Sequence, residues 1–223
     1  MTSTEIQPFT SSTALFVTGE RTVQLDATLR PQKLNDVLRA GVEAEQQLFA
    51  ANVEGVGVLG AQGFRLERRT PLVNAMAAGR VPVAVGDHGL ILERRDAGWV
   101  DPTPTASRGD VVAFIEREAL QAVTADCELL ERGTSGWTSR TLLPTERCAD
   151  AVADGPSLVV LTAGGSVVEF DASLGQTGRE SLGSGLEGRR LWRAESGALV
   201  VTTATDVFVK PPGGLFDAVR ALG

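Results

Sequence analysis

Asp87 and His88 are neighbouring residues whose side-chain types could support acid–base chemistry or bind a metal ion. His88 is the only histidine, so a site built from several histidines is excluded. Both residues occupy the centre of Gly86-Asp-His-Gly89, a sequence typical of a tight hairpin turn. Ala61-Gln62 occupies the same two positions of Gly60-Ala-Gln-Gly63 and lacks that chemistry. We therefore favour a turn for Asp87 and His88, and a ligand contact stays open because loops on rigid folds often carry function.

Hairpins of valine- and leucine-rich strands must position these turns, and such hairpins recur along the chain. They occupy six segments: Leu15 to Leu25, Val56 to Arg68, Val83 to Arg94, Ala122 to Glu131, Leu158 to Phe170 and Leu199 to Val209. Successive turns lie 41, 26, 38, 38 and 40 residues apart, counted from Gly19, Gly60, Gly86, Thr124, Thr162 and Thr202. A four-stranded propeller blade has about this length, so the spacing predicts an all-β fold, a β-propeller with six blades.

The 26-residue interval is too short for four strands, so we expect one blade to be irregular or incomplete. In that blade, Arg69 to Met76 would cross to the next blade with its outer strand shortened or missing. Glycines and prolines are spread along the chain, which indicates one domain over residues 1–223. Leu34 to Ala50 fits a helix or an innermost strand. Leu215 to Leu222 fits a helix, a last outer strand, or a partner strand for Ile6 to Phe9.

The segment Gly86-Asp-His-Gly-Leu-Ile-Leu-Glu-Arg-Arg-Asp-Ala-Gly-Trp99 resembles the repeat of BNR or Asp-box propellers, which include the photosystem II assembly-factor family. In that repeat a Gly-x-x-Gly hairpin leads to an Asp-x-Gly-x-x-Trp turn. Its aspartate caps backbone amides and its tryptophan packs between blades. Asp96-Ala-Gly-Trp99 lacks the two residues between glycine and tryptophan, and Gly133-Thr-Ser-Gly-Trp137 lacks the aspartate. The resemblance covers two or three blades and implies a fold, with Trp99 and Trp137 packed between blades.

Some Asp-box propellers are sialidases, which use a tyrosine nucleophile. This chain has no tyrosine, so a tyrosine-dependent sialidase is excluded. A glycosidase that uses two carboxylates stays open, because the chain has 28 acidic residues and their separations do not follow from the sequence. The chain lacks the Gly-x-x-x-x-Gly-Lys-Ser/Thr sequence of a phosphate-binding loop. We expect neither a cofactor nor a metal site.

Charge and cysteine content limit the partners and the compartment. The net charge of -7 opposes binding to nucleic acid or to an anionic membrane. Cys127 and Cys148 are the only cysteines, and we expect two small buried apolar residues, with a bridge between them as the less favoured alternative. Met1 to Phe9 does not resemble a signal peptide, and no run of eighteen apolar residues occurs, so we expect a cytoplasmic protein.

The hairpin turns and the connections between blades should gather on one face of a propeller. The turns would be Glu20-Arg21, Ala61-Gln62, Asp87-His88, Ala125-Asp126, Ala163-Gly164 and Thr203-Ala204, and the connections Pro104 to Asp110, Pro144 to Cys148 and Gly183 to Gly188. Our candidate partner-binding residues are Asp87, His88, Arg108, Asp126 and Arg147. Arginine anchors on such a surface suit a peptide or protein partner. We therefore predict a non-enzymatic protein-interaction or assembly scaffold. The alternatives are a carbohydrate-active hydrolase or lyase and a lectin-like ligand-binding domain.

Overall fold

The structure is a computed structural model of the chain. It describes residues 7–10, 14–18, 23–26, 31–34, 37–96, 98–101, 109–117, 119–194 and 196–219. Within these residues the secondary structure is β-strand apart from one 3₁₀ turn, η1 (Asp87–Gly89), and no helix is long and apolar enough to cross a membrane. Leu34 to Ala50 is therefore not a helix. Its described part leads into β5 and β6, which pair as antiparallel strands, from Ala40 with Ala51 to Ala44 with Gln47.

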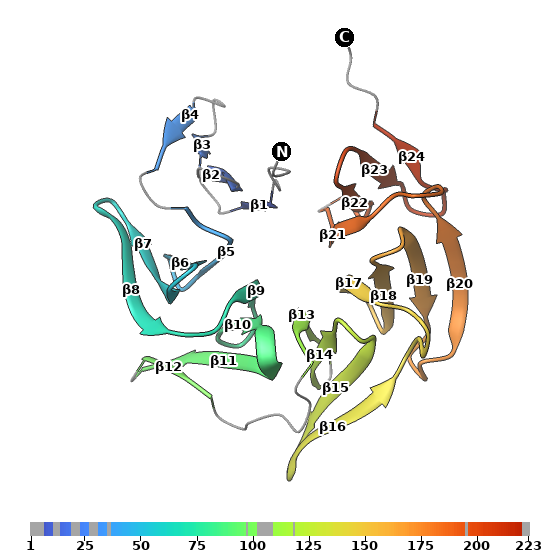
Figure 1. Cartoon of the computed structure of the whole chain (residues 1–223), viewed down its shortest axis with the longest axis horizontal. Helices are drawn as coiled ribbons and strands as arrows, with labels where there is room; N and C mark the ends of the chain where they lie inside the picture. Colours follow the sequence, from blue (N-terminus) through green and yellow to red (C-terminus); the bar gives the residue numbers. More distant parts are fainter. Residues whose placement is uncertain are drawn as a thin grey trace. The chain divides into compact units, whose positions relative to one another are not determined.

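The described strands form six four-stranded antiparallel sheets, which we number in chain order (Figure 1). Sheet 1 contains β1 (Gln7–Thr10), β2 (Ala14–Thr18), β3 (Val23–Asp26) and β4 (Pro31–Lys33). Sheet 2 contains β5 (Ala40–Ala44), β6 (Gln47–Asn52), β7 (Gly55–Gly60) and β8 (Gly63–Arg69). Sheet 3 contains β9 (Val73–Ala78), β10 (Pro82–Gly86), β11 (Leu90–Arg95) and β12 (Gly98–Val100).

The remaining sheets follow the same order of strands. Sheet 4 contains β13 (Val111–Glu116), β14 (Leu120–Thr124), β15 (Glu128–Gly133) and β16 (Gly136–Thr141). Sheet 5 contains β17 (Cys148–Asp154), β18 (Ser157–Thr162), β19 (Ser166–Phe170) and β20 (Gln176–Ser181). Sheet 6 contains β21 (Gly188–Arg193), β22 (Leu199–Thr203), β23 (Val207–Lys210) and β24 (Asp217–Ala218). Because β24 pairs with β23, the C-terminal segment supplies the outer strand of the last sheet, one of the alternatives open from the sequence.

Each sheet is a meander of consecutive antiparallel strands, so its connections alternate between two edges. We use the term loop edge for the end of each sheet at which the second strand turns into the third strand and at which the fourth strand leaves for the next sheet. The opposite edge carries the other two turns. Asp87-His88 and Ala125-Asp126 lie on the loop edges of their sheets, as predicted. Ala61-Gln62 joins β7 to β8 and lies on the opposite edge, so its predicted placement is wrong.

This difference explains the 26-residue interval. Gly60 precedes a turn between the third and fourth strands, whereas Gly86 precedes a turn between the second and third. Sheets 2 and 3 both have four strands, and β8 (Gly63–Arg69) is a full outer strand, so the expected incomplete blade is wrong. The equivalent turn of sheet 2 begins at Asn52, whose Oδ1 accepts hydrogen bonds from the backbone N–H groups of Glu54 (2.8 Å) and Gly55 (3.1 Å). An asparagine cap therefore replaces the glycine or threonine that marks the other turns.

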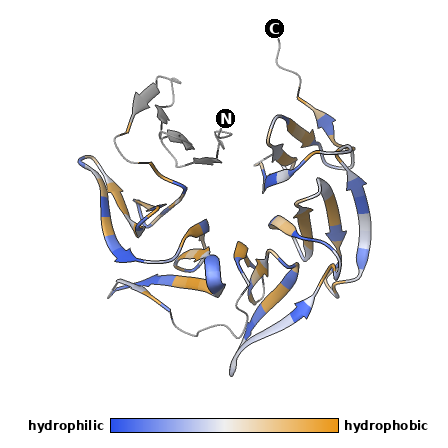
Figure 2. Cartoon of the chain, in the orientation of Figure 1, coloured by the Kyte–Doolittle hydropathy of each residue, from blue (hydrophilic) through white to orange (hydrophobic). Residues whose placement is uncertain are grey.

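The chain divides into two compact units, which we describe separately. Unit 1 holds residues 1–114 and 134–137, and unit 2 holds residues 115–133 and 138–223. The core of unit 1 lies between sheets 2 and 3 and includes Phe49, Val56, Val73, Leu92 and Trp99. The core of unit 2 lies between sheets 5 and 6 and includes Val159, Leu161, Leu191, Leu199 and Val201. Within sheet 5, Figure 2 shows β18 and β19 as mostly hydrophobic and the outer strand β20 as hydrophilic to neutral.

Candidate functional site

Asp126 and Arg147 meet at the loop edge in unit 2. Arg147 Nη1 lies 3.0 Å from Asp126 Oδ1, and both side chains are about two-thirds exposed, at 65% and 62%. Asp126 comes from the turn between β14 and β15, and Arg147 immediately precedes β17, the first strand of sheet 5. Two residues selected from the sequence as candidate anchors are thus joined in one exposed ion pair. Such an exposed pair adds little to stability.

A disulfide fixes the two segments that carry this pair. Cys127 follows Asp126 and Cys148 follows Arg147, and the two cysteines are bonded with their Cα atoms 5.0 Å apart. Both cysteines are buried, as predicted, but the expectation of two free thiols is wrong. The reason is topological, because the turn of sheet 4 lies against the start of sheet 5: the Cys148 N–H donates to the Ala125 carbonyl at 2.9 Å.

Cys127 also has an unusual backbone conformation. Its φ is +56°, in the left-handed region, whereas the equivalent positions of the turns in sheets 3 and 5 are glycines, Gly89 (φ +73°) and Gly165 (φ +74°). Non-glycine residues rarely adopt this conformation, and they persist in it where the surrounding structure enforces it. The Thr124 carbonyl accepts from the Cys127 N–H at 3.0 Å, which closes the turn. The disulfide and the turn therefore hold Asp126 in a defined position.

The backbone of Arg147 is fixed on its other side by sheet 5. Its carbonyl accepts a hydrogen bond of 2.8 Å from the N–H of Ala163, which lies in the turn between β18 and β19. Next to it, Glu146 accepts two hydrogen bonds from Arg179, at 2.7 and 2.8 Å, and these bonds lower the pKa of Glu146. Arg179 also donates to Ser166 Oγ at 3.1 Å. The segment that carries Arg147 is thus held by hydrogen bonds to sheet 5.

Asp87 and His88 belong to unit 1, where they form the loop-edge turn of sheet 3. The carboxylate of Asp87 accepts from Asn74 Nδ2 at 2.9 Å, and the His88 N–H donates to Asp110 Oδ1 at 3.2 Å. Gly86 precedes the turn because a Cβ there would lie 2.0 Å from the Leu72 carbonyl oxygen. His88 is exposed and has φ +59°. The turn interpretation therefore agrees with the structure, and the imidazole faces solvent.

The fifth candidate, Arg108, lies outside the described residues. The structure thus brings Asp126 and Arg147 together in unit 2 and places Asp87 and His88 next to each other in unit 1. Among the residues it describes, no three His, Cys, Asp or Glu side chains cluster as metal ligands would.

Asp150 is a buried carboxylate that the sequence did not single out. It lies on β17 after a bulge, and its side chain spans to sheet 6, where Oδ2 accepts from the Leu191 N–H at 2.9 Å. Oδ1 accepts from the Ala151 N–H at 2.9 Å. Burial raises the pKa of Asp150 from 3.8 to about 6, although the positive charge of Arg190 and the two N–H groups act in the other direction. The carboxylate joins the innermost strands of sheets 5 and 6.

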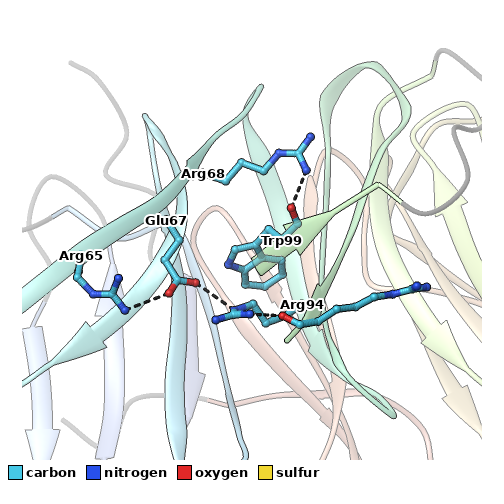
Figure 3. A network of polar contacts seen from close by, with 6 residues as sticks. Arg65, Glu67, Arg68, Arg94 and Trp99 are labelled. Carbon is cyan, nitrogen blue, oxygen red and sulfur yellow. Dashed lines mark hydrogen bonds and ion pairs between the residues drawn. The ribbon is translucent and has the colours of Figure 1, made fainter. Parts of the chain in front are cut away.

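Trp99 packs between sheets, as predicted. Its ring meets that of Phe49 edge to face, with centroids 5.8 Å apart, and its side chain lies in the core of unit 1. An ionic network covers it: Arg68 Nη1 donates to the Trp99 carbonyl at 2.7 Å, and Arg94 Nε donates to Glu67 Oε2 at 3.1 Å (Figure 3). Arg68 and Arg94 thus join β8 to β11 and β12, a role that was not visible from sequence spacing.

One turn on the opposite edge is capped by an aspartate, Asp171, which the resemblance did not include. Asp171 Oδ1 accepts from the Ser173 N–H at 2.9 Å, the Ser173 hydroxyl at 2.7 Å and the Gly175 N–H at 2.9 Å. These bonds, led by the one from the Ser173 hydroxyl, lower the pKa of Asp171. The turn joins β19 to β20, the position that Asp96 has between β11 and β12.

Comparisons with known proteins show the fold. No protein-family model and no curated sequence matches the chain. A streptogramin B lyase structure covers 98% of this chain and 81% of its own, with a TM-score of 0.77 and 11% identity. A catalytically inactive virginiamycin B lyase from Staphylococcus aureus, solved with quinupristin, covers 100% of this chain and 87% of its own, with a TM-score of 0.78 and 10% identity. YCF48 bound to a D1 peptide covers 97% and 81%, with a TM-score of 0.68 and 13% identity. These structures are β-propellers, so the chain has a β-propeller fold, as its repeat spacing predicted.

Proposed function

We propose that this chain is a non-enzymatic protein-binding or assembly module, a single six-bladed propeller domain that binds a peptide or protein at the loop edges of its sheets. The observation that carries the proposal is the exposed Asp126–Arg147 pair, held 3.0 Å apart on segments that the Cys127–Cys148 disulfide ties together. Arginine at the centre of a rigid, polar surface is a frequent source of binding energy. The likeness to YCF48 in complex with a peptide supports the same use of the fold.

The charge of the chain supports a polypeptide partner over a nucleic acid. At a net charge of -7, counter-ion release cannot drive binding to a polyanion without a strong local excess of cations.

The disulfide counts against the cytoplasm that we expected from the sequence, because cytosolic thiols are kept reduced. We therefore propose that the protein works in an oxidising compartment.

The test is affinity capture with two matched variants. Arg147→Glu reverses the charge of the loop-edge pair, and Arg193→Glu reverses that of the Arg193–Asp154 pair, which lies on the opposite edge in the same unit. Partners captured from the source organism at low and moderate salt should be retained by Arg193→Glu and lost by Arg147→Glu. Equal retention by the two variants would refute a loop-edge site.

A lyase is the second candidate, because two lyase structures align with almost the whole chain. The inactive virginiamycin B lyase carries an alanine in place of a histidine, and the single histidine of this chain, His88, is exposed on a loop edge. Incubation with quinupristin, followed by chromatography of the antibiotic, separates the two candidates. Unchanged quinupristin is expected. Conversion that disappears in His88→Ala would establish the lyase instead.

A further inference from the structure

Arg39 holds a distinctive position among the charged residues of the loop edges. In four sheets the residue immediately before the innermost strand is charged: Arg39 before β5, Asp110 before β13, Arg147 before β17 and Glu187 before β21. Three of these charges have partners, because Asp110 accepts from the His88 N–H, Arg147 pairs with Asp126, and Glu187 pairs with Arg189 at 2.8 Å.

Arg39 has no such partner among the residues that the structure describes. Its Nε is buried and has no hydrogen-bond acceptor there. A buried donor without an acceptor costs roughly 1–3 kcal/mol, so this group calls for an explanation. The backbone of Arg39 is fixed, since its N–H donates to the Ala51 carbonyl at 2.8 Å. Among the described loop-edge residues of the same sheet, the carboxylate of Glu54 is already paired with Arg69 at 3.2 Å.

Two exposed valines accompany Arg39 on the same edge of sheet 2. Val37 lies two residues before it and is 40% exposed, and Val53, at the tip of the turn between β6 and β7, is 66% exposed. The pairing of Ala40 with Ala51 brings the segment before β5 next to this turn. The Asn52 cap fixes the turn, so Val53 stays presented to solvent. Arg39, a half-buried cation without an ion-pair partner among the described residues, thus lies on the same loop edge as two exposed apolar residues.

We infer that Arg39 binds a carboxylate carried by an apolar peptide residue, whose side chain contacts Val37 and Val53. The planar guanidinium prefers carboxylates and can donate two parallel hydrogen bonds to one. The valines provide apolar contact that a phosphate or a sugar would not use, and the net charge of the chain opposes polyanions. This inference rests on the proposed function and specifies the chemistry of the bound peptide in unit 1.

The experiment uses the full chain labelled with ¹⁵N-arginine and two probes that differ only in charge, N-acetyl-leucine and N-acetyl-leucinamide. The Nε–Hε signal of Arg39, assigned by its loss in Arg39→Lys, should shift saturably with N-acetyl-leucine and not with the amide. Val53→Ala should weaken the binding about fivefold, as expected for removing part of one apolar contact. Arg65→Gln alters an exposed arginine on the opposite edge of sheet 2 and should bind like the unaltered chain.

An Arg39 signal that does not move, or that moves equally with both probes, would overturn the inference. Because both probes are compared on the unaltered chain, this outcome does not depend on how a variant folds. The proposed function is tested separately through Arg147 in unit 2. Partner capture that depends on Arg147, together with an unresponsive Arg39, would reject only the carboxylate site, whereas a responsive Arg39 without any captured partner would reject the proposed function.

Discussion

Asp150 should make the stability of this protein fall as the pH rises through the mildly acidic range. Its carboxylate is buried between β17 and β21, and burial raises its pKa to about 6 from an ordinary 3.8. The folded state therefore binds a proton more tightly than the unfolded state. Stability from this group is complete only well below pH 3.8, where both states are protonated, and is lost progressively as the pH rises to about 6.

The magnitude follows from the difference between the two pKa values. Each unit corresponds to 1.36 kcal/mol, so a rise from 3.8 to about 6 corresponds to about 3 kcal/mol of the free energy of unfolding in total, of which about 2 kcal/mol is lost between pH 4 and pH 7. Asp150→Asn removes the titrating group. The difference in unfolding free energy between the unaltered chain and this variant should therefore change by about 2 kcal/mol over the window from pH 4 to pH 7, and subtraction cancels the groups that both proteins share.

The assay is urea unfolding at several pH values from about 4 to 7. Asp171→Asn is a matched control, because the lowered pKa of Asp171 places its titration below this window. Its curve should run parallel to that of the unaltered chain. Parallel curves for Asp150→Asn, or an unaltered chain that gains stability relative to the variant as the pH rises, would refute the assigned burial of Asp150.

Three further changes test the packing described above, each by urea unfolding. Replacing Cys127 and Cys148 by serine should cost about 3 kcal/mol, because their 21-residue separation sets the loop entropy that the bond removes; an unchanged midpoint would contradict the disulfide. In the Cys148→Ser background, Cys127→Gly should be about 1 kcal/mol more stable than Cys127→Ser, since glycine adopts φ +56° without strain; the reverse order would exclude a strained turn. Trp99→Phe should cost about 1 kcal/mol and Trp99→Ala about 3–5, because the indole N–H has no acceptor among the described residues; equal losses would argue against packing as its role.

The repeat spacing was sufficient to predict the fold, because four short strands and their turns require nearly the same number of residues in each sheet. The spacing could not identify which two strands of a sheet a given hairpin turn joins. Gly60-Ala-Gln-Gly63 and Gly86-Asp-His-Gly89 have the same local chemistry, yet they join different strand pairs. Counting from Asn52 instead of Gly60 gives intervals of 33 and 34 residues to Gly19 and Gly86, close to the remaining spacings.

The candidate site was predicted only in part, for reasons that are also physical. Exposed turn residues such as Asp126 and Arg147 follow from strand boundaries, so the sequence can place them on the loop edges. The ion pair between Asp126 and Arg147 depends on how the turn of sheet 4 lies against the first strand of sheet 5. The disulfide depends on the same contact. Arg39 was missed because Leu34 to Ala50 fitted both a helix and a strand. Its unpaired Nε becomes visible only with the tertiary structure.

Hydrogen–deuterium exchange on the complex of this chain with its captured partner tests the loop-edge site most directly. The amides of residues 124–127 and 145–148, which carry the Asp126–Arg147 pair, should become protected when the partner binds. The turns on the opposite edge of sheet 5, residues 154–157 and 171–175, should exchange at the same rate in the free and bound states. Protection confined to those opposite-edge turns would contradict the central claim that the loop edge binds the partner.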